Sequence, residues 1–167
     1  SLARTGRRVL LIDADMRSPS LHHLVGMSGE AGLSNYLSGS DDIDTLVLAT
    51  PQAGLHLLPA GPEPPSAADL LSGDRFGRLI AILLDRFDHI VVDAPPVMGL
   101  SDAPLVASRV EGTIFVVEAH ATAKSVARIA ISRLHGAHVR LLGAVLSKFD
   151  TRRSHYSYGY AYGYGYG

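Results

Sequence analysis

The chain has 167 residues, of which 47% are hydrophobic and 19% are charged; this is enough apolar material for one core, and we expect a single domain. Fifteen basic and sixteen acidic residues give a formal net charge of −1, so no overall positive field attracts nucleic acid or anionic lipid. The lack of cysteine excludes disulfides and thiolate metal sites, and no apolar run approaches the ~20 residues that span a bilayer.

The first segment, residues 1–6, does not begin with methionine and is typical of the last turn of a helix that a glycine closes. We therefore expect the chain to be a fragment that begins inside a fold, with a preceding strand and loop upstream.

Short apolar runs bounded by charge predict strands buried on both faces of a parallel sheet; they cover residues 8–13, 89–93, 113–118 and 140–146. Two helix-length segments with apolar residues on one face lie between the later runs, at residues 74–87 and 122–134. This alternation predicts right-handed crossovers and an α/β fold with a doubly wound, mainly parallel sheet.

Residues 40–72 follow a looser pattern, which we interpret as an ordered connection with a short strand at residues 55–58 and a proline-rich turn after it. Beyond Asp150 the sequence becomes basic and then a Tyr/Gly repeat, in which alternating glycine costs too much backbone entropy to fold alone. We therefore predict a nucleotide-binding domain over residues 1–150 and a flexible tyrosine-rich tail over residues 151–167.

Aspartates follow two of the predicted strands: Asp13 and Asp15 after the first, and Asp93 after the run at residues 89–93. Ligands of doubly wound sheets bind at the carboxyl ends of the strands, so we expect a shared site. Asp93 suits a magnesium-holding role, and one carboxylate of the first pair could accept a hydrogen bond or proton from an attacking hydroxyl. Each motif alone could be a turn-capping aspartate, but two together favour a site.

A phosphate-binding loop of the form G-x-x-x-x-G-K-[ST], or a related glycine–lysine loop, does not occur in the sequence. Without a lysine and magnesium, three clustered carboxylates would repel one another. We therefore expect these 167 residues alone to bind nucleotide poorly, and we expect the missing loop to precede the helix that ends at Gly6.

The last twelve residues hold six of the seven tyrosines, a pattern that no packed domain needs. The candidate phosphate acceptors are Tyr156, Tyr158, Tyr160, Tyr162, Tyr164 and Tyr166. An extended tail of about eighteen residues reaches roughly 60 Å, which would bring it to the site of a neighbouring subunit. The alternative is a low-complexity segment that serves weak self-association.

Three features together resemble the bacterial tyrosine kinases of exopolysaccharide and capsule biosynthesis, the polysaccharide co-polymerase autokinases. Residues 10–17 (Leu-Leu-Ile-Asp-Ala-Asp-Met-Arg) match the family's second Walker motif, residues 90–96 (Ile-Val-Val-Asp-Ala-Pro-Pro) match its Walker B motif, and the tyrosine cluster is similar to its terminal signature. Residues 32–39 and 57–65, the latter followed by Asp-Leu-Leu at residues 69–71, also resemble the family's connecting segments.

This resemblance implies a P-loop NTPase-like fold of the deviant Walker type, with the P-loop strand missing here, and autophosphorylation from ATP with Mg²⁺. Asp13, Asp15 and Arg17 would be catalytic, with Asp13 acting on the tyrosine hydroxyl. Asp13, Asp15 and Asp93 would bind the cofactor, and Asp15 and Asp93 would hold the metal. Ser147 departs from the asparagine that often reads adenine in related ATPases, which weakens the expectation of adenine selectivity.

The resemblance further implies control of exopolysaccharide or capsule export by a homo-oligomer whose subunits phosphorylate one another's tails, with no nucleic-acid partner. A membrane activator or co-polymerase domain, fused or separate, would hold the domain at the cytoplasmic face of the plasma membrane. Two alternatives remain open. An ATPase switch like the chromosome-partitioning and division-site proteins (ParA/MinD-like) would hydrolyse ATP without forming phosphotyrosine, and a non-catalytic interaction module would display its tail to another kinase.

Overall fold

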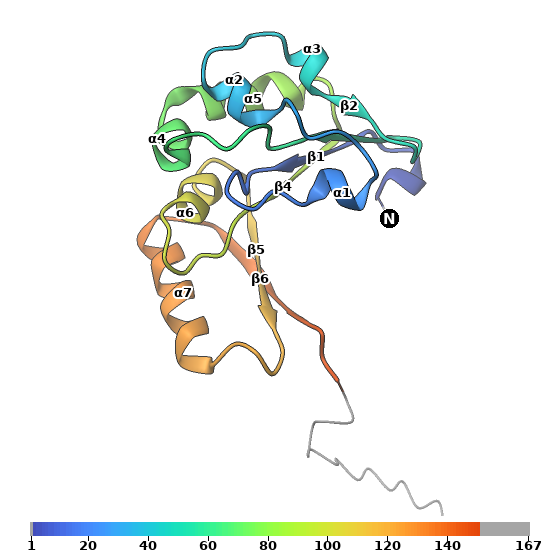
Figure 1. The fold of residues 1–167 in the computed structure, drawn as a ribbon. Coiled ribbons are helices and arrows are strands. Elements are labelled where there is room, and N and C mark those ends of the chain that lie inside the picture. Colours follow the sequence, from blue (N-terminus) through green and yellow to red (C-terminus); the bar gives the residue numbers. More distant parts are fainter. Residues whose placement is uncertain (1, 151–167) are drawn as a thin grey trace, which may run out of the picture.

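The computed structural model describes residues 2–150, in which short helices alternate with strands (Figure 1). In chain order the elements are η1 (Leu2–Thr5), β1 (Val9–Asp13), α1 (Leu21–Leu24), α2 (Leu33–Leu37), α3 (Ile43–Leu46), β2 (Leu48–Ala49), β3 (Leu55–Leu58), α4 (Ala67–Ser72), α5 (Asp74–Leu84), β4 (His89–Asp93), α6 (Asp102–Ala107), β5 (Thr113–Glu118), α7 (Lys124–Gly136) and β6 (Leu141–Ser147).

Within the described residues 2–150, the strands form two sheets rather than one. A four-stranded sheet has the order β2-β3-β1-β4, in which β1 pairs in parallel with β3 and β4 while β2 runs antiparallel to β3. The strands β5 and β6 form a separate parallel pair. The predicted α/β class with a mainly parallel sheet is confirmed, but β4 and β5 are not hydrogen-bonded neighbours within residues 2–150.

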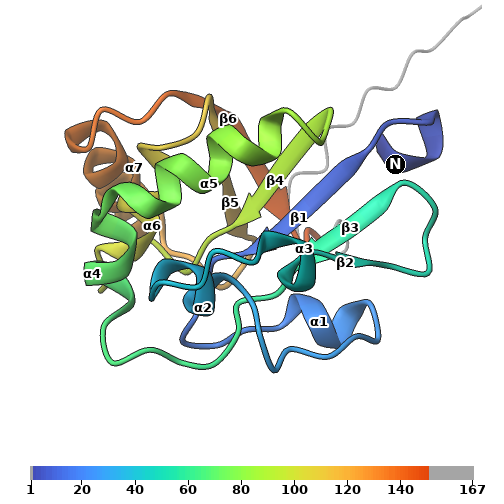
Figure 2. The same ribbon diagram turned by 90° about the horizontal axis from the view of Figure 1, so that it is seen from above.

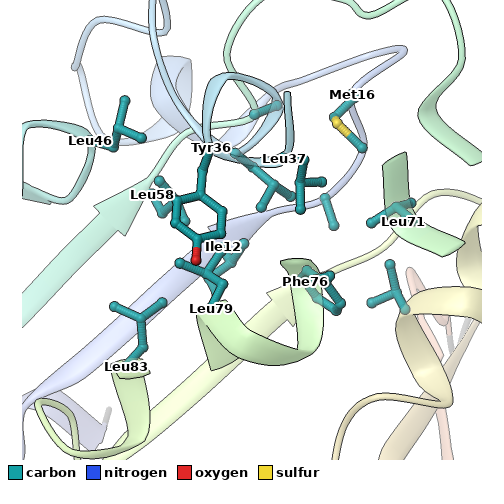
Figure 3. Packing of buried hydrophobic residues seen from close by; sticks show 14 of the residues in the cluster. Ile12, Met16, Tyr36, Leu37, Leu46, Leu58, Leu71, Phe76, Leu79 and Leu83 are labelled. Atoms are coloured by element: carbon teal, nitrogen blue, oxygen red, sulfur yellow. The ribbon is translucent and has the colours of Figure 1, made fainter. Parts of the chain in front are cut away.

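The main core lies on the face of the four-stranded sheet that α2, α4 and α5 cover (Figures 2 and 3). Ile12 of β1 is fully buried there, and α5 presents Phe76, Leu79 and Leu83 to it. The spacing of these three residues places them on one side of a helix, so the sequence pattern that predicts α5 also explains which face it buries.

Within residues 2–150, the β5–β6 pair has cover on one face only. Leu134 of α7 packs with Val139 and Ala107, and the side chain of Phe115 from β5 lies against this small cluster. On the two strands, Ile114, Val116 and Leu142 remain exposed. The pair and α7 lie beside α6, apart from the four-stranded sheet (Figure 1).

Most predicted elements occur where the pattern places them, with ends that shift by at most three residues. The predicted opening turn is the short η1, after which Gly6 takes φ +80°, a left-handed conformation that favours glycine. The connection over residues 40–72 holds more structure than expected, namely α3, β2 and α4 besides the predicted β3. The helix α6 was not predicted because it is only six residues long and contains Pro104. The predicted tail at residues 151–167 lies outside the described residues.

Candidate active site at the ends of β1 and β4

The strands β1 and β4 end side by side, and each ends in an aspartate. Asp13 and Asp93 are partners in the parallel register, and the backbone N–H of Ala14 donates to the Asp93 carbonyl at 2.8 Å. Because both strands run in the same direction, their carboxyl ends share one edge of the sheet. The aspartates of the two predicted motifs therefore lie at the same edge.

Asp13 is fully buried beneath the turn that follows β1. Its Oδ1 accepts the backbone N–H of Asp15 at 3.2 Å, and its Oδ2 accepts those of Ser20 and Leu21, both at 3.0 Å. These bonds satisfy a carboxylate that would otherwise be costly to bury, and they fix the turn and the start of α1. In this arrangement Asp13 organises the loop; its action on a tyrosine hydroxyl stays a prediction.

Asp15 is only partly buried, and its carboxylate shapes the outer half of the same turn. Its Oδ1 accepts the backbone N–H groups of Arg17 at 3.3 Å and Ser18 at 3.0 Å. A short aspartate side chain that bonds to its own backbone two residues on is a common turn-forming device. Asp15 is therefore the aspartate of this turn that is accessible from outside.

The pKa of Asp93 lies above its ordinary value. Partial desolvation is the larger cause, and the negative charges of Asp13 and Asp15 add to it. Their charges at the neighbouring strand end therefore disfavour the ionised form of Asp93. A cation at this edge would relieve that repulsion.

The site suits a hydrated ion better than an ion enclosed by protein ligands. Among residues 2–150, no group of three or more acidic or histidine side chains is arranged to hold a metal. Mg²⁺ commonly keeps several waters and binds through one or two carboxylates together with substrate phosphates. Asp15 and Asp93, each with an accessible side, fit that mode.

Arg17 extends from the turn to Asp102, the first residue of α6. Its Nε donates to Asp102 Oδ2 at 2.9 Å. This hydrogen bond, followed by the charge of Asp102, raises the pKa of Arg17 above its ordinary value. The guanidinium is thus bound to a protein carboxylate, and a catalytic role for Arg17 stays a prediction.

The relatives of this chain identify its protein family. No family model matches it. The chain is 34% identical to CapB of Staphylococcus aureus, which carries the name of a tyrosine-protein kinase, over 158 residues that make up 93% of this chain and 69% of CapB. The chain belongs to the bacterial tyrosine-protein kinases. It is also 34% identical to the tyrosine-protein kinase Wzc of Salmonella typhi over 93% of its own length, but it spans only 22% of Wzc.

Solved structures agree with this family. The kinase domain of the Escherichia coli tyrosine kinase ETK superposes with a TM-score of 0.85 at 33% identity, covering 96% of this chain and 63% of that domain. The cell-division ATPase MinD of Pyrococcus furiosus gives a TM-score of 0.70 at 24% identity, over 87% of this chain and 61% of MinD, and therefore shares the fold. The predicted kinase resemblance and the P-loop NTPase-like fold are both confirmed.

Away from the aspartates, a hollow of this tyrosine-kinase domain lies at the carboxyl ends of β5 and β6. Its volume is about 240 Å³, and its walls include His120, Lys124 and Phe149. The rings of His120 and Phe149 stack with centroids 6.1 Å apart. Ser147, which sequence reasoning noted for adenine selectivity, donates its hydroxyl to the Val117 carbonyl at 3.3 Å, so that hydroxyl is committed within the sheet.

Sequence reasoning missed one residue of this region, Asp102, which is 1% exposed and charged. The available signal was weak: a serine and an aspartate before the apolar residues 103–107 are typical of a helix start. Nothing in that pattern indicates that the aspartate faces Arg17, 85 residues earlier in the chain.

Proposed function

We propose that this chain is the catalytic domain of a protein-tyrosine autokinase that transfers phosphate from ATP to tyrosines at its own carboxyl terminus. The observation that carries the proposal is the register pairing of Asp13 with Asp93, which brings the two aspartate motifs together in a chain of the tyrosine-kinase family. The six acceptor tyrosines, Tyr156, Tyr158, Tyr160, Tyr162, Tyr164 and Tyr166, lie outside the described residues.

Asp93 and Asp15 would hold Mg²⁺ through its water shell, and the bound ion would neutralise negative charge on the phosphates. Asp15 is partly buried whereas Asp13 is fully buried and accepts three backbone N–H groups. For Asp13 to accept a hydrogen bond from the tyrosine hydroxyl, the turn at residues 14–20 would have to open. In the arrangement described, Asp13 acts by holding that turn in place.

Phosphoryl transfer also needs a cationic cradle for the phosphates, and these 167 residues contain no such loop. The test therefore compares the 167-residue chain with the same chain preceded by a strand and a G-x-x-x-x-G-K-[ST] loop. Both are incubated with ATP and Mg²⁺ and mapped by phosphotyrosine mass spectrometry. We expect phosphate on the six tyrosines of the extended protein and none on the shorter chain.

The Asp13→Asn/Asp93→Asn double variant of the extended protein should lose this phosphate. Asp85→Asn is the matched control, because Asp85 is exposed and follows α5 at the opposite end of β4. Phosphate retained by the double variant would overturn the assignment of the aspartate site.

An ATPase switch is the second candidate, and the fold shared with MinD favours it. It predicts that the extended protein hydrolyses ATP and leaves every tyrosine unmodified. The same mass-spectrometry experiment, run beside a phosphate-release assay, separates the two functions. Phosphate on the tail only after another kinase is added would instead indicate a non-catalytic interaction module.

The kinase would act as a homo-oligomer in which the tail of each subunit reaches the active site of a neighbour. The oligomer would control exopolysaccharide or capsule export. Six phosphates would add roughly −9 to −12 charges, enough to drive subunits apart. Native mass spectrometry before and after phosphorylation should show a loss of size, and an unchanged oligomer would contradict this model of regulation. None of the helices within residues 2–150 is long and apolar enough to cross a membrane. As part of the same proposal, a fused or separate membrane activator would hold the kinase at the cytoplasmic face of the plasma membrane.

A further inference from the structure

Within residues 2–150, two hydrogen bonds connect the residues after β1 to the end of β4 and to the helix α6 that follows it. The first is at the strand ends, where the Ala14 N–H donates to the Asp93 carbonyl at 2.8 Å. The second lies farther along both loops, where Arg17 Nε donates to Asp102 Oδ2 at 2.9 Å. Asp102 begins α6, so this second contact ties the turn after β1 to the helix that follows β4.

The Arg17–Asp102 pair differs from an ordinary surface salt bridge. Asp102 is 1% exposed, and its Oδ1 has no hydrogen-bond partner within residues 2–150. A buried carboxylate is costly unless it is paired, and losing its cation leaves an uncompensated charge. In the exposed pair Arg86–Asp44, the two side chains are 2.8 Å apart and the Asp44 side chain is 81% exposed. Water solvates that carboxylate, so it does not need its cation in the way that the buried Asp102 does.

Arg17 also belongs to the turn that Asp15 shapes. Its backbone N–H donates to Asp15 Oδ1 while its side chain holds Asp102. Fixing Arg17 at both ends limits where the Asp15 carboxylate can lie relative to Asp93. We propose that Asp102 is a positioning residue of the aspartate site: through Arg17 it anchors the turn that carries Asp15 to helix α6. The effect on catalysis rests on the proposed kinase function, whereas the anchoring does not.

The anchoring is tested on the 167-residue chain by hydrogen exchange of single amides. In Asp102→Ala, the amides of Arg17 and Ser18, which bond to Asp15, should exchange about tenfold faster or more. The amide of Leu11 in the middle of β1 should be unaffected. Asp44→Ala is the matched control, because it removes an ion pair of similar length on the surface. Asp102→Asn, which keeps the volume, serves if Asp102→Ala does not fold. Unchanged exchange at both amides would overturn the proposal.

A double-mutant cycle tests whether the pair acts as a unit. Arg17→Ala strands the buried Asp102 carboxylate, whereas Asp102→Ala leaves Arg17 partly in water. Arg17→Ala should therefore lower the melting temperature more than Asp102→Ala does. Adding Asp102→Ala to Arg17→Ala should recover part of the loss. Strictly additive losses would mean that the two side chains are not coupled.

Steady-state kinetics test whether this anchoring affects catalysis. They use the extended protein, in which a strand and a G-x-x-x-x-G-K-[ST] loop precede the chain. Asp102→Ala should lower kcat for tail phosphorylation about tenfold or more while KM for ATP changes little. A misplaced catalytic group stabilises the transition state less, whereas it contributes little to the binding of ATP in the ground state. Asp102→Asn retains an acceptor for Arg17 Nε and should fall between wild type and Asp102→Ala. Faster amide exchange with an unchanged kcat would overturn the link to catalysis. If wild type itself transfers no phosphate, the kinase proposal fails, and hydrogen exchange alone decides the anchoring.

Discussion

The two sheets of this chain are built from the same kind of strand but differ in burial. In β1, Leu10 and Ile12 are fully buried, whereas Ile114 and Val116 of β5 are 59% and 61% exposed. In the described part of the chain, helices α2, α4 and α5 cover the first sheet on its core face, while β5 and β6 have α7 on one face only. Apolar runs of this type are expected where both faces of a parallel sheet are covered. An apolar run therefore identifies a strand without identifying what packs on it.

The largest predicted effect contrasts the two sheets directly. Phe76 is fully buried in the main core, so Phe76→Ala leaves a cavity and should lower the free energy of unfolding by about 3–5 kcal/mol. Ile114→Ala, on the uncovered face, should change it by less than about 0.5 kcal/mol. Urea unfolding of both variants beside wild type measures the difference. Similar losses would mean that the exposed face of β5 is covered in solution, for example by self-association.

The sequence predicted the strands and longer helices because their periodicity is local. Residues 89–93 and 113–118 are strands as expected, and α5 begins at Asp74 as expected. The division into two sheets was not predictable, because it depends on whether β4 and β5 pair, and neither run encodes its neighbour. Short helices such as α6, with its proline, carry too little pattern to detect.

The candidate site was predictable to a similar extent. The aspartates at the ends of two parallel strands predict one shared edge, and Asp13 and Asp93 are register partners there. The roles inside the turn were not predictable, because three backbone N–H groups occupy Asp13 and Asp102 reaches Arg17 from a distant helix. Such contacts depend on the path of a loop, which a single sequence does not specify.

Strand β4 lies at the edge of the first sheet and is exposed at alternate positions, so its charged ends respond to water more than β1 does. The raised pKa of Asp93 means that ionisation costs folded-state stability. That cost is absent below the ordinary carboxyl pKa and grows as the pH rises through the raised value. Asp93→Asn removes it, so the melting temperature should rise at pH 7 by a small amount, on the order of 2 °C, because water screens the exposed side of Asp93.

The difference between Asp93→Asn and wild type should shrink as the pH falls towards 4. It should also shrink when Mg²⁺ is added at pH 7, because the ion offsets the repulsion only in wild type. Asp85→Asn should show neither trend. A lower melting temperature for Asp93→Asn at pH 7 would mean that Asp93 makes stabilising contacts that outweigh its repulsion.

The smallest effect, of opposite sign, is expected at the other end of β4. Asp88 Oδ2 accepts the backbone N–H of Arg8 at 2.7 Å, and this bond lowers the pKa of Asp88 below its ordinary value. The resulting stability is fully present above the ordinary carboxyl pKa and is lost as the pH falls through the lowered one. Asp88→Asn keeps an acceptor for Arg8, so its melting temperature at pH 7 should fall slightly, by less than Asp93→Asn raises it. Measured from pH 3 to pH 7, the two variants should diverge from wild type in opposite directions as the pH rises. A shift of both in the same direction would indicate that strand packing, rather than the local charges at each end, determines how β4 responds to substitution.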